Sequence, residues 1–232
     1  AHSDDLSTNA ITPQLPSGLS FFRRQGVSVD VVAMSIGGND FGFGDVIADC
    51  LGSAGGGCEA TGSAARQAVA RGAQVLPGRF TTLAGALVSA GVPRGNVLLT
   101  QHLNPLRRTA NDLCSGLEFE DALMRFISDE ESVFAGSVHR DLNEQMRTAA
   151  TAHRWKLVSS HLGSETTHGM CTSDPWFNDT RTALDTQGED LPSPFPGIGI
   201  SAGMVHPNQD GHRLGYAPAW EAAIDGVLRT RF

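Results

Sequence analysis

The chain has 232 residues, of which 40% are hydrophobic and 18% charged, and its formal net charge is -8. This size supports one sizeable core, and no linker divides the chain, so we expect residues 1–232 to form a single domain. We also expect the protein to be a monomer. The acidic balance and the lack of a basic run argue against nucleic-acid binding, and no apolar stretch approaches the ~20 residues of a membrane span.

The N-terminal part predicts a helix and then a strand. Residues Thr8–Gln25 carry an apolar face at helical spacing, and Gly26 stands where helices commonly end. The β-branched run Val29–Ile36 follows, and its near-continuous apolar character is typical of a strand buried on both faces. The run ends abruptly in Gly37-Gly38-Asn39-Asp40.

The middle of the chain alternates helical and extended patterns. We expect a short helix or turn over Phe41–Leu51 and a longer helix over Ala64–Gly91, which Pro77-Gly78 should break or kink. The further predicted elements, in order, are a strand at Asn96–Gln101, a loop at Leu103–Gly116, helices at Leu117–Ile127 and Val138–His153, a strand at Trp155–Ser159, a long loop at Ser160–Met204 and a final helix at Gln209–Arg229 interrupted at Pro218.

Alternation of helices and strands predicts an α/β fold with a parallel sheet and right-handed crossovers. Three strands make a thin sheet, and the chain opens with what resembles the carboxyl end of another strand. The start, Ala1–Asp5, has neither Met nor the basic and apolar regions of a signal peptide. We therefore expect a processed or truncated chain whose first strand, or first two, lie upstream of Ala1.

Four cysteines allow two disulfides in three pairings. Cys50 and Cys58 flank a glycine-rich loop that can close, so we favour Cys50–Cys58 and Cys114–Cys171. The alternatives are a metal site, for which the Cys and His spacings do not fit, and four reduced buried thiols. Disulfides imply an oxidising compartment and hence export.

Two stretches have the residue types of a hydrolytic site. Asn39 follows a strand at its carboxyl end, where open α/β sheets bind ligands, and a fixed amide there can donate to a developing oxyanion. His206, followed by Pro207 at a helix entrance, could act as a general base. The alternatives are an ordinary turn at Asn39 and a surface histidine at His206. For His212 we expect a surface or structural role, because its spacing from His206 does not fit a helical metal-ligand pair.

The two stretches together resemble the SGNH hydrolase superfamily, the GDSL-type lipases and esterases. Gly37, Asn39 and Asp40 match the family's Gly-x-Asn-Asp block, and His206-Pro207-Asn208 matches its C-terminal His block. The resemblance covers most of the chain and implies a three-layer α/β/α sandwich of flavodoxin type. Two disulfides would fit its secreted actinobacterial members.

The other family blocks match less well. Ala1-His2-Ser3-Asp4 resembles the block that contributes a backbone N–H to the oxyanion hole, but Asp4 stands where the family has Gly. A ragged chain start is the alternative. The Gly-Asp-Ser block with the nucleophile is absent, so the nucleophile is unknown and expected upstream. Ser3 would lie near the site but in a different block, so we do not expect it to be the nucleophile.

The residue that orients the histidine also departs from the pattern. Most relatives have Asp three residues before the His, where this chain has Gly203. The resemblance then implies a backbone carbonyl between Ser201 and Met204 as the partner of His206. Asp210 lies on the wrong side of His206 for this role.

The sequence therefore predicts a secreted serine ester hydrolase with His206 as base, Asn39 and the N–H of Asp4 as oxyanion donors, and Gly37, Gly38 and Gly203 in support. It needs no cofactor or metal, and its substrate is a small-molecule or lipid ester. Trp176, Phe177 and Phe195 could wall an acyl pocket, or belong to a solvated loop anchored by Cys171. The alternative function is an inactive module of the same fold that binds glycan or lipid.

Overall fold

The computed structural model describes residues 18, 21–22, 24–52, 57–121, 123–188, 201 and 203–229. Within these ranges the helices are α2 (Phe43–Gly52), α3 (Ala64–Ser89), α4 (Asp129–His153), α5 (Glu165–His168), α6 (Thr180–Gln187) and α7 (Ala217–Leu228), with a π-helical segment η5 (Gly211–Tyr216) before α7. The strands are β1 (Val32–Met34), β2 (Val97–Thr100), β3 (Arg107–Thr109), β4 (Asp112–Leu113) and β5 (Lys156–Val158).

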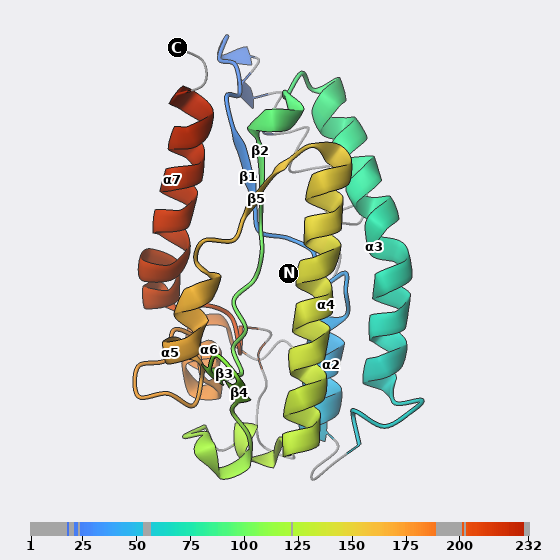
Figure 1. The fold of residues 1–232 in the computed structure, drawn as a ribbon, viewed down its shortest axis with the longest axis vertical. Helices are drawn as coiled ribbons and strands as arrows, with labels where there is room; N and C mark the ends of the chain where they lie inside the picture. The colour runs from blue at the N-terminus through green and yellow to red at the C-terminus, as the bar shows by residue number, and fades with distance from the viewer. Residues whose placement is uncertain are drawn as a thin grey trace.

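The main sheet is parallel and has the order β1-β2-β5. Ala33 pairs with Leu98, and Leu98 pairs with Lys156, so the three strands end at the same edge. Helices α2, α3 and α4 cover one face and α7 covers the other, where Leu98, Val158, Ala219 and Val227 form a separate apolar cluster (Figure 1). The predicted α/β class with three layers is confirmed.

Strand β1 corrects one expectation. It is shorter than the predicted Val29–Ile36, and its side chains are half-buried except for the exposed Ala33. Among the described residues β1 pairs with β2 alone, so it is an edge strand and not a strand buried on both faces. Strand β2, between two neighbours, has four fully buried residues as predicted.

Of the break or kink expected at Pro77, the break is absent, because helix α3 continues through this residue. Proline removes one hydrogen bond of the helix, but the buried side chains Leu76 and Phe80 on either side hold both halves against the core. Packing thus outweighs the local preference. The final helical region is divided at the predicted place, because η5 gives way to α7 at Ala217, beside Pro218.

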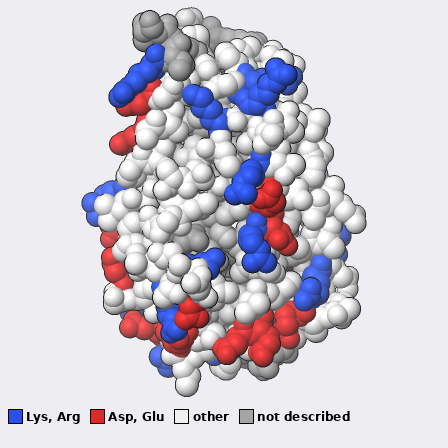
Figure 2. Space-filling model, in the orientation of Figure 1, with Lys and Arg blue, Asp and Glu red and all other residues white. Residues whose placement is uncertain are grey.

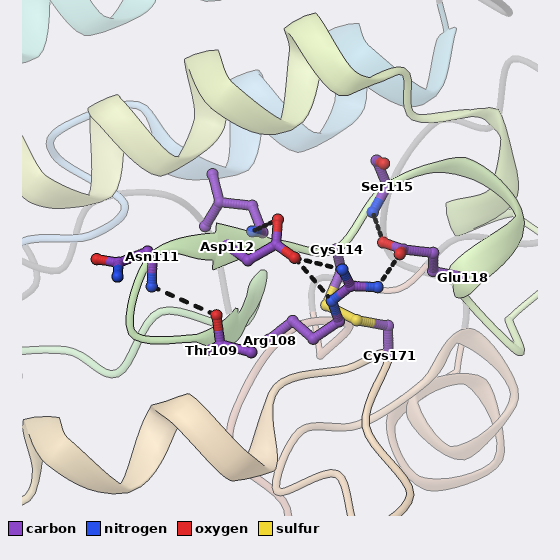
Figure 3. A network of polar contacts seen from close by, with 9 residues as sticks. Arg108, Thr109, Asn111, Asp112, Cys114, Ser115, Glu118 and Cys171 are labelled. Atoms are coloured by element: carbon purple, nitrogen blue, oxygen red, sulfur yellow. Dashed lines mark hydrogen bonds and ion pairs between the residues drawn. A yellow bond between two sulfur atoms is a disulfide. The ribbon is translucent and has the colours of Figure 1, made fainter.

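The segment expected as a loop at Leu103–Gly116 contains the hairpin β3–β4. Arg108 pairs with both Asp112 and Glu118 across it, and the Cys114–Cys171 disulfide lies beside this network (Figure 3). The helix expected at Leu117–Ile127 is replaced by two 3₁₀ turns, η2 (Gly116–Glu118) and η3 (Met124–Phe126). Both occur where the chain turns toward the N-terminus of α4.

Both predicted disulfides are present, Cys50–Cys58 and Cys114–Cys171. The first ties the C-terminal end of α2 to the loop before α3, and the second ties the hairpin to the segment after α5.

Most of the predicted helix Thr8–Gln25 lies outside the described residues, but Gly26 does adopt a positive φ of 68° after a helical turn. On the face in Figure 2, basic side chains are interspersed with acidic ones.

Candidate active site

A cavity of about 500 Å³ lies at the carboxyl edge of the main sheet and receives residues from both ends of the chain. Its lining is mainly apolar and includes the turn after β1, the segment after β2, one side of α4, and the loop and helix near the C-terminus. The lining residues with polar side chains are Ser35, Asn39, His102, His139, His206, His212, Tyr216 and Trp220. The parallel register explains the convergence, because all three strands deliver their following residues to this edge.

The turn after β1 brings Asn39 to the cavity. Gly37 is buried and has a φ of +107°, a backbone conformation that side chains other than glycine rarely adopt, so this position favours glycine. Three hydrogen bonds then close the turn, from the N–H groups of Phe41, Gly42 and Phe43 to the carbonyls of Gly37, Asn39 and Gly38. The exposed Asn39 side chain therefore stands on a defined backbone that continues directly into α2.

The next residue, Asp40, has a structural role. Its side chain is completely buried and forms an ion pair with Arg79 of α3, whose side chain is 30% exposed. A buried carboxylate requires such a partner, since the cost of removing it from water is several kcal/mol. The pair fixes the Asn39 turn to the long helix beneath it.

His206 takes its orientation from the backbone. Its Nδ1 lies 3.2 Å from the carbonyl oxygen of Met204. Because a carbonyl only accepts, this contact places the proton of the neutral ring on Nδ1 and leaves a lone pair on Nε2. The ring is exposed and lines the cavity. The contact lies within the predicted stretch Ser201–Met204 and leaves a ring that can accept a proton at Nε2.

The loop that carries His206 is held in a costly conformation. Val205 has a φ of +58°, a left-handed conformation that β-branched residues strongly disfavour. Asn178 stabilises it, because its carbonyl accepts from Val205 N–H, its N–H donates to the His206 carbonyl, and its side-chain amide donates to Gly203. Such strain typically persists where the surroundings over-determine a functional position.

Among the other histidines that line the cavity, His102 and His139 are neutral at pH 7. The pKa of His102 is lowered to about 4, mainly by burial and to a lesser extent by the nearby His206 and His161, whereas a hydrogen bond to Ile36 acts to raise it. Burial likewise lowers the pKa of His139 to about 3. The interior of the cavity therefore presents uncharged imidazoles, which suits an uncharged substrate.

The remaining predicted residues fall as follows. Gly38 lines the cavity beside Asn39, and Gly203 lies in the His206 loop, where its carbonyl accepts from His206 N–H at 3.3 Å. Asp210 forms an ion pair with Arg213, so it is not the partner that orients His206. His212 is exposed and also lines the cavity. Asp4, Ser3 and Phe195 lie outside the described residues.

Of the two aromatic residues Trp176 and Phe177 that were predicted to line an acyl pocket, only Phe177 lines the cavity. Phe177 lines the cavity and forms a bridge with Pro207, whereas Trp176 is buried and stacks on His168 with ring centroids 3.8 Å apart. The sequence reasoning missed His102, His139, Tyr216 and Trp220. For His102 a signal exists, since it follows a buried strand directly at its carboxyl end.

In the described part of the chain, one group of three potential metal ligands comes together, Cys50, Cys58 and Glu131. Both sulfur atoms belong to a disulfide, so this group does not bind a metal. None of the helices in the described ranges is long and apolar enough to cross a membrane.

Comparison with known proteins gives structural neighbours only. No protein-family model and no curated protein match the chain. Among solved structures, it is similar to an extracellular lipase from Streptomyces rimosus, with a TM-score of 0.57, 18% identity, and coverage of 84% of this chain and 70% of the other. It is also similar to phospholipase A1 from Streptomyces albidoflavus NA297, with a TM-score of 0.53, 20% identity, and coverage of 83% and 68%. The chain therefore shares the α/β fold of these two Streptomyces proteins.

Proposed function

We propose that the protein is a serine ester hydrolase of the SGNH type, acting on lipid or small-molecule carboxylic esters. One observation carries the proposal: Asn39 and His206, from opposite ends of the chain, line the same apolar cavity, and a backbone carbonyl orients His206. The structural neighbours support it, because one is an extracellular lipase and the other a phospholipase A1.

In this proposal His206 is the general base. Its Nε2 takes the proton of a serine hydroxyl as the oxygen attacks the acyl carbonyl, and it returns that proton to the departing alcohol. The Met204 carbonyl holds the ring in the required tautomer and stabilises the imidazolium through its dipole. Water then attacks the acyl-enzyme by the same route, and the acid is released.

Asn39 is the proposed oxyanion donor. Its side-chain amide would donate to the negatively charged oxygen of the tetrahedral intermediate, together with backbone N–H groups at the nucleophile and at Asp4. Gly37 and Gly38 let the turn approach the reacting carbon closely. Gly203 supports the base by accepting hydrogen bonds from Asn178 and His206 within the loop.

We further propose that the nucleophile stands on a strand upstream of Ala1. Strand β1 pairs with β2 alone within the described ranges, so its other edge can accept a parallel strand. Exposure of Ala33 and Ser35 on β1 and just after it supports that arrangement. A strand added there would end at the cavity edge, beside Asn39. The two disulfides support export of the protein.

The test uses the full-length protein, including the residues upstream of Ala1, with a short p-nitrophenyl ester. Asn39→Ala should lower kcat by about 10²–10³, as expected for the loss of one oxyanion donor. His206→Ala should lower it at least as much. Asn111→Ala and His153→Ala, which change the same residue types away from the cavity, should leave the rate unchanged.

Near wild-type hydrolysis by both Asn39→Ala and His206→Ala would overturn the assignment. If the wild-type protein hydrolyses no ester but binds lipid vesicles or glycans, the chain is instead a binding module with this fold.

A further inference from the structure

The segment that follows β2 is held unusually firmly. The Asn143 side chain of α4 accepts from the N–H of His102 and donates to its carbonyl, both at 2.9 Å. Gln101 donates from its side chain to the carbonyl of Asn143 at 2.8 Å, and the Gln101 carbonyl lies 2.8 Å from Nε2 of His161. Groups from α4 and from the segment after β5 thus fix the backbone on which His102 stands.

The C-terminal part of the chain also contacts this segment. The Tyr216 hydroxyl of η5 accepts from the N–H of Leu103 at 3.0 Å. Gln101 and Asn143 are both buried, so these hydrogen bonds are shielded from competition with water. The backbone from which the His102 side chain extends is therefore held in place.

That ring reaches across to the neighbouring strand. Its Nε2 lies 3.4 Å from the carbonyl oxygen of Ile36, the residue immediately before Gly37-Gly38-Asn39. The carbonyl requires a donor, so the ring carries its proton on Nε2. Ile36 lies beyond the last paired residue of β1, Met34, and the sheet does not hold it in register.

The surroundings keep this ring in one protonation state. The titratable groups that face it are His206 from the C-terminal loop, His161 from the segment after β5 and His139 from α4. His206 and His161 oppose a positive charge on His102, and burial does so more strongly. The Nε2–H donor is therefore present throughout the neutral range.

We infer that His102 is a positioning residue: its hydrogen bond to Ile36 ties the Asn39 turn to the rigid segment after β2 and so sets where the Asn39 amide stands. The consequence for catalysis rests on the proposed function, but the positioning itself does not. His102 is not required to contact the reacting atoms.

The test compares His102→Leu, which removes the donor, with His102→Gln, whose amide can still donate to Ile36. The first readout is hydrogen exchange at the N–H groups of Phe41, Gly42 and Phe43, which close the turn. His102→Leu should speed their exchange roughly three- to tenfold, as expected for one lost hydrogen bond, whereas His102→Gln should stay near wild type. His153→Leu, at the far end of α4, controls for the loss of a histidine.

The second readout is kinetics on a short ester. In His102→Leu kcat should fall by roughly the same factor or more with KM unchanged, and His102→Gln should restore it. If His102→Leu does not fold, His102→Asn takes its place, because its side chain is polar but too short to reach Ile36.

Unchanged exchange in the variant without the donor would overturn the inference, as would equal acceleration in His102→Gln. If the wild-type protein shows no hydrolysis, the proposed function fails, and the exchange measurement still decides the role of His102.

Discussion

Neighbouring residues in the Gly37–Asp40 stretch have separate tasks. Asn39 is exposed and lines the cavity, whereas the side chain of Asp40 is buried and forms an ion pair with Arg79. The sequence alone predicted Asn39 as a site residue, because a strand that ends in Gly-Gly-Asn-Asp is informative. It could not reveal the partner of Asp40, which lies on α3 and is brought near only by tertiary packing.

At His206 the imidazole contacts a backbone carbonyl, that of Met204. In the proposed mechanism this carbonyl takes the place of an orienting carboxylate, but it has only a partial charge and would stabilise the imidazolium less. Which carbonyl serves could not be predicted, because the choice depends on the left-handed φ of Val205. That conformation follows from the contacts of Asn178, a residue distant in sequence.

The buried histidines make stability depend on pH. Burial is the main cause that lowers the pKa of His102 to about 4 and of His139 to about 3, from 6.5. Between pH 6.5 and about 4 the unfolded chain binds protons that the folded chain refuses, so the free energy of unfolding should fall as pH falls through this window.

Urea denaturation at pH 7, 6 and 5 measures this effect. A His139→Leu variant should show a shallower decrease than wild type, because one of the two groups is gone. Equal unfolding free energies at pH 7 and pH 5 in the wild-type protein would show that neither ring is held neutral in the folded state.

At the scale of elements, α3 and the buried strand β2 were predictable from their apolar patterns, whereas α4 was predicted only in part, because it begins at Asp129 and not at Val138. The hairpin β3–β4 was not, since its short strands depend on the Arg108 ion pairs and on the Cys114–Cys171 disulfide. The helix break predicted at Pro77 is absent for a related reason. The cost of one proline inside a helix, about 3 kcal/mol, is offset here by the burial of Leu76 and Phe80, which place both halves of the helix against the core.

Two glycines of α3 offer a matched prediction. A Cβ at Gly72 would lie 2.6 Å from backbone atoms of Phe41, the start of the segment that leads from the Asn39 turn into α2. Gly72→Ala should therefore destabilise the protein, although alanine favours the helix by about 1 kcal/mol. Gly85 has nothing within 4 Å of its Cβ position, so Gly85→Ala should stabilise by up to about 1 kcal/mol.

Thermal or urea unfolding of both variants gives the comparison. Stabilisation by Gly72→Ala similar to that by Gly85→Ala would mean that α3 and Phe41 do not pack as closely as described.

For the whole molecule, the two disulfides are expected to stabilise the folded state by different amounts. Cys50–Cys58 closes a loop of 8 residues and Cys114–Cys171 one of 57. Chain-entropy arguments give about 2.5 kcal/mol for the shorter loop and about 4 kcal/mol for the longer. Replacing Cys114 and Cys171 by Ser should thus lower the urea midpoint more than replacing Cys50 and Cys58. The reverse order would argue against the entropic account.

The cavity as a whole was only partly predictable. Motifs from the two ends of the chain indicated Asn39 and His206, and the parallel topology explains why they meet. The histidines from the middle of the chain and the aromatic residues near its end belong to no motif. They enter the site because α4 and α7 cover opposite faces of one thin sheet and both reach its carboxyl edge (Figure 1).

The central claim, a serine hydrolase site built on His206, is tested most directly by covalent labelling of the full-length protein with a fluorophosphonate. This reagent phosphonylates a serine oxygen only when a nearby base activates it, and fluoride leaves. We predict one modified serine, upstream of Ala1, with labelling greatly slowed in His206→Ala. No adduct in the wild-type protein, or labelling at the same rate without His206, would contradict the account.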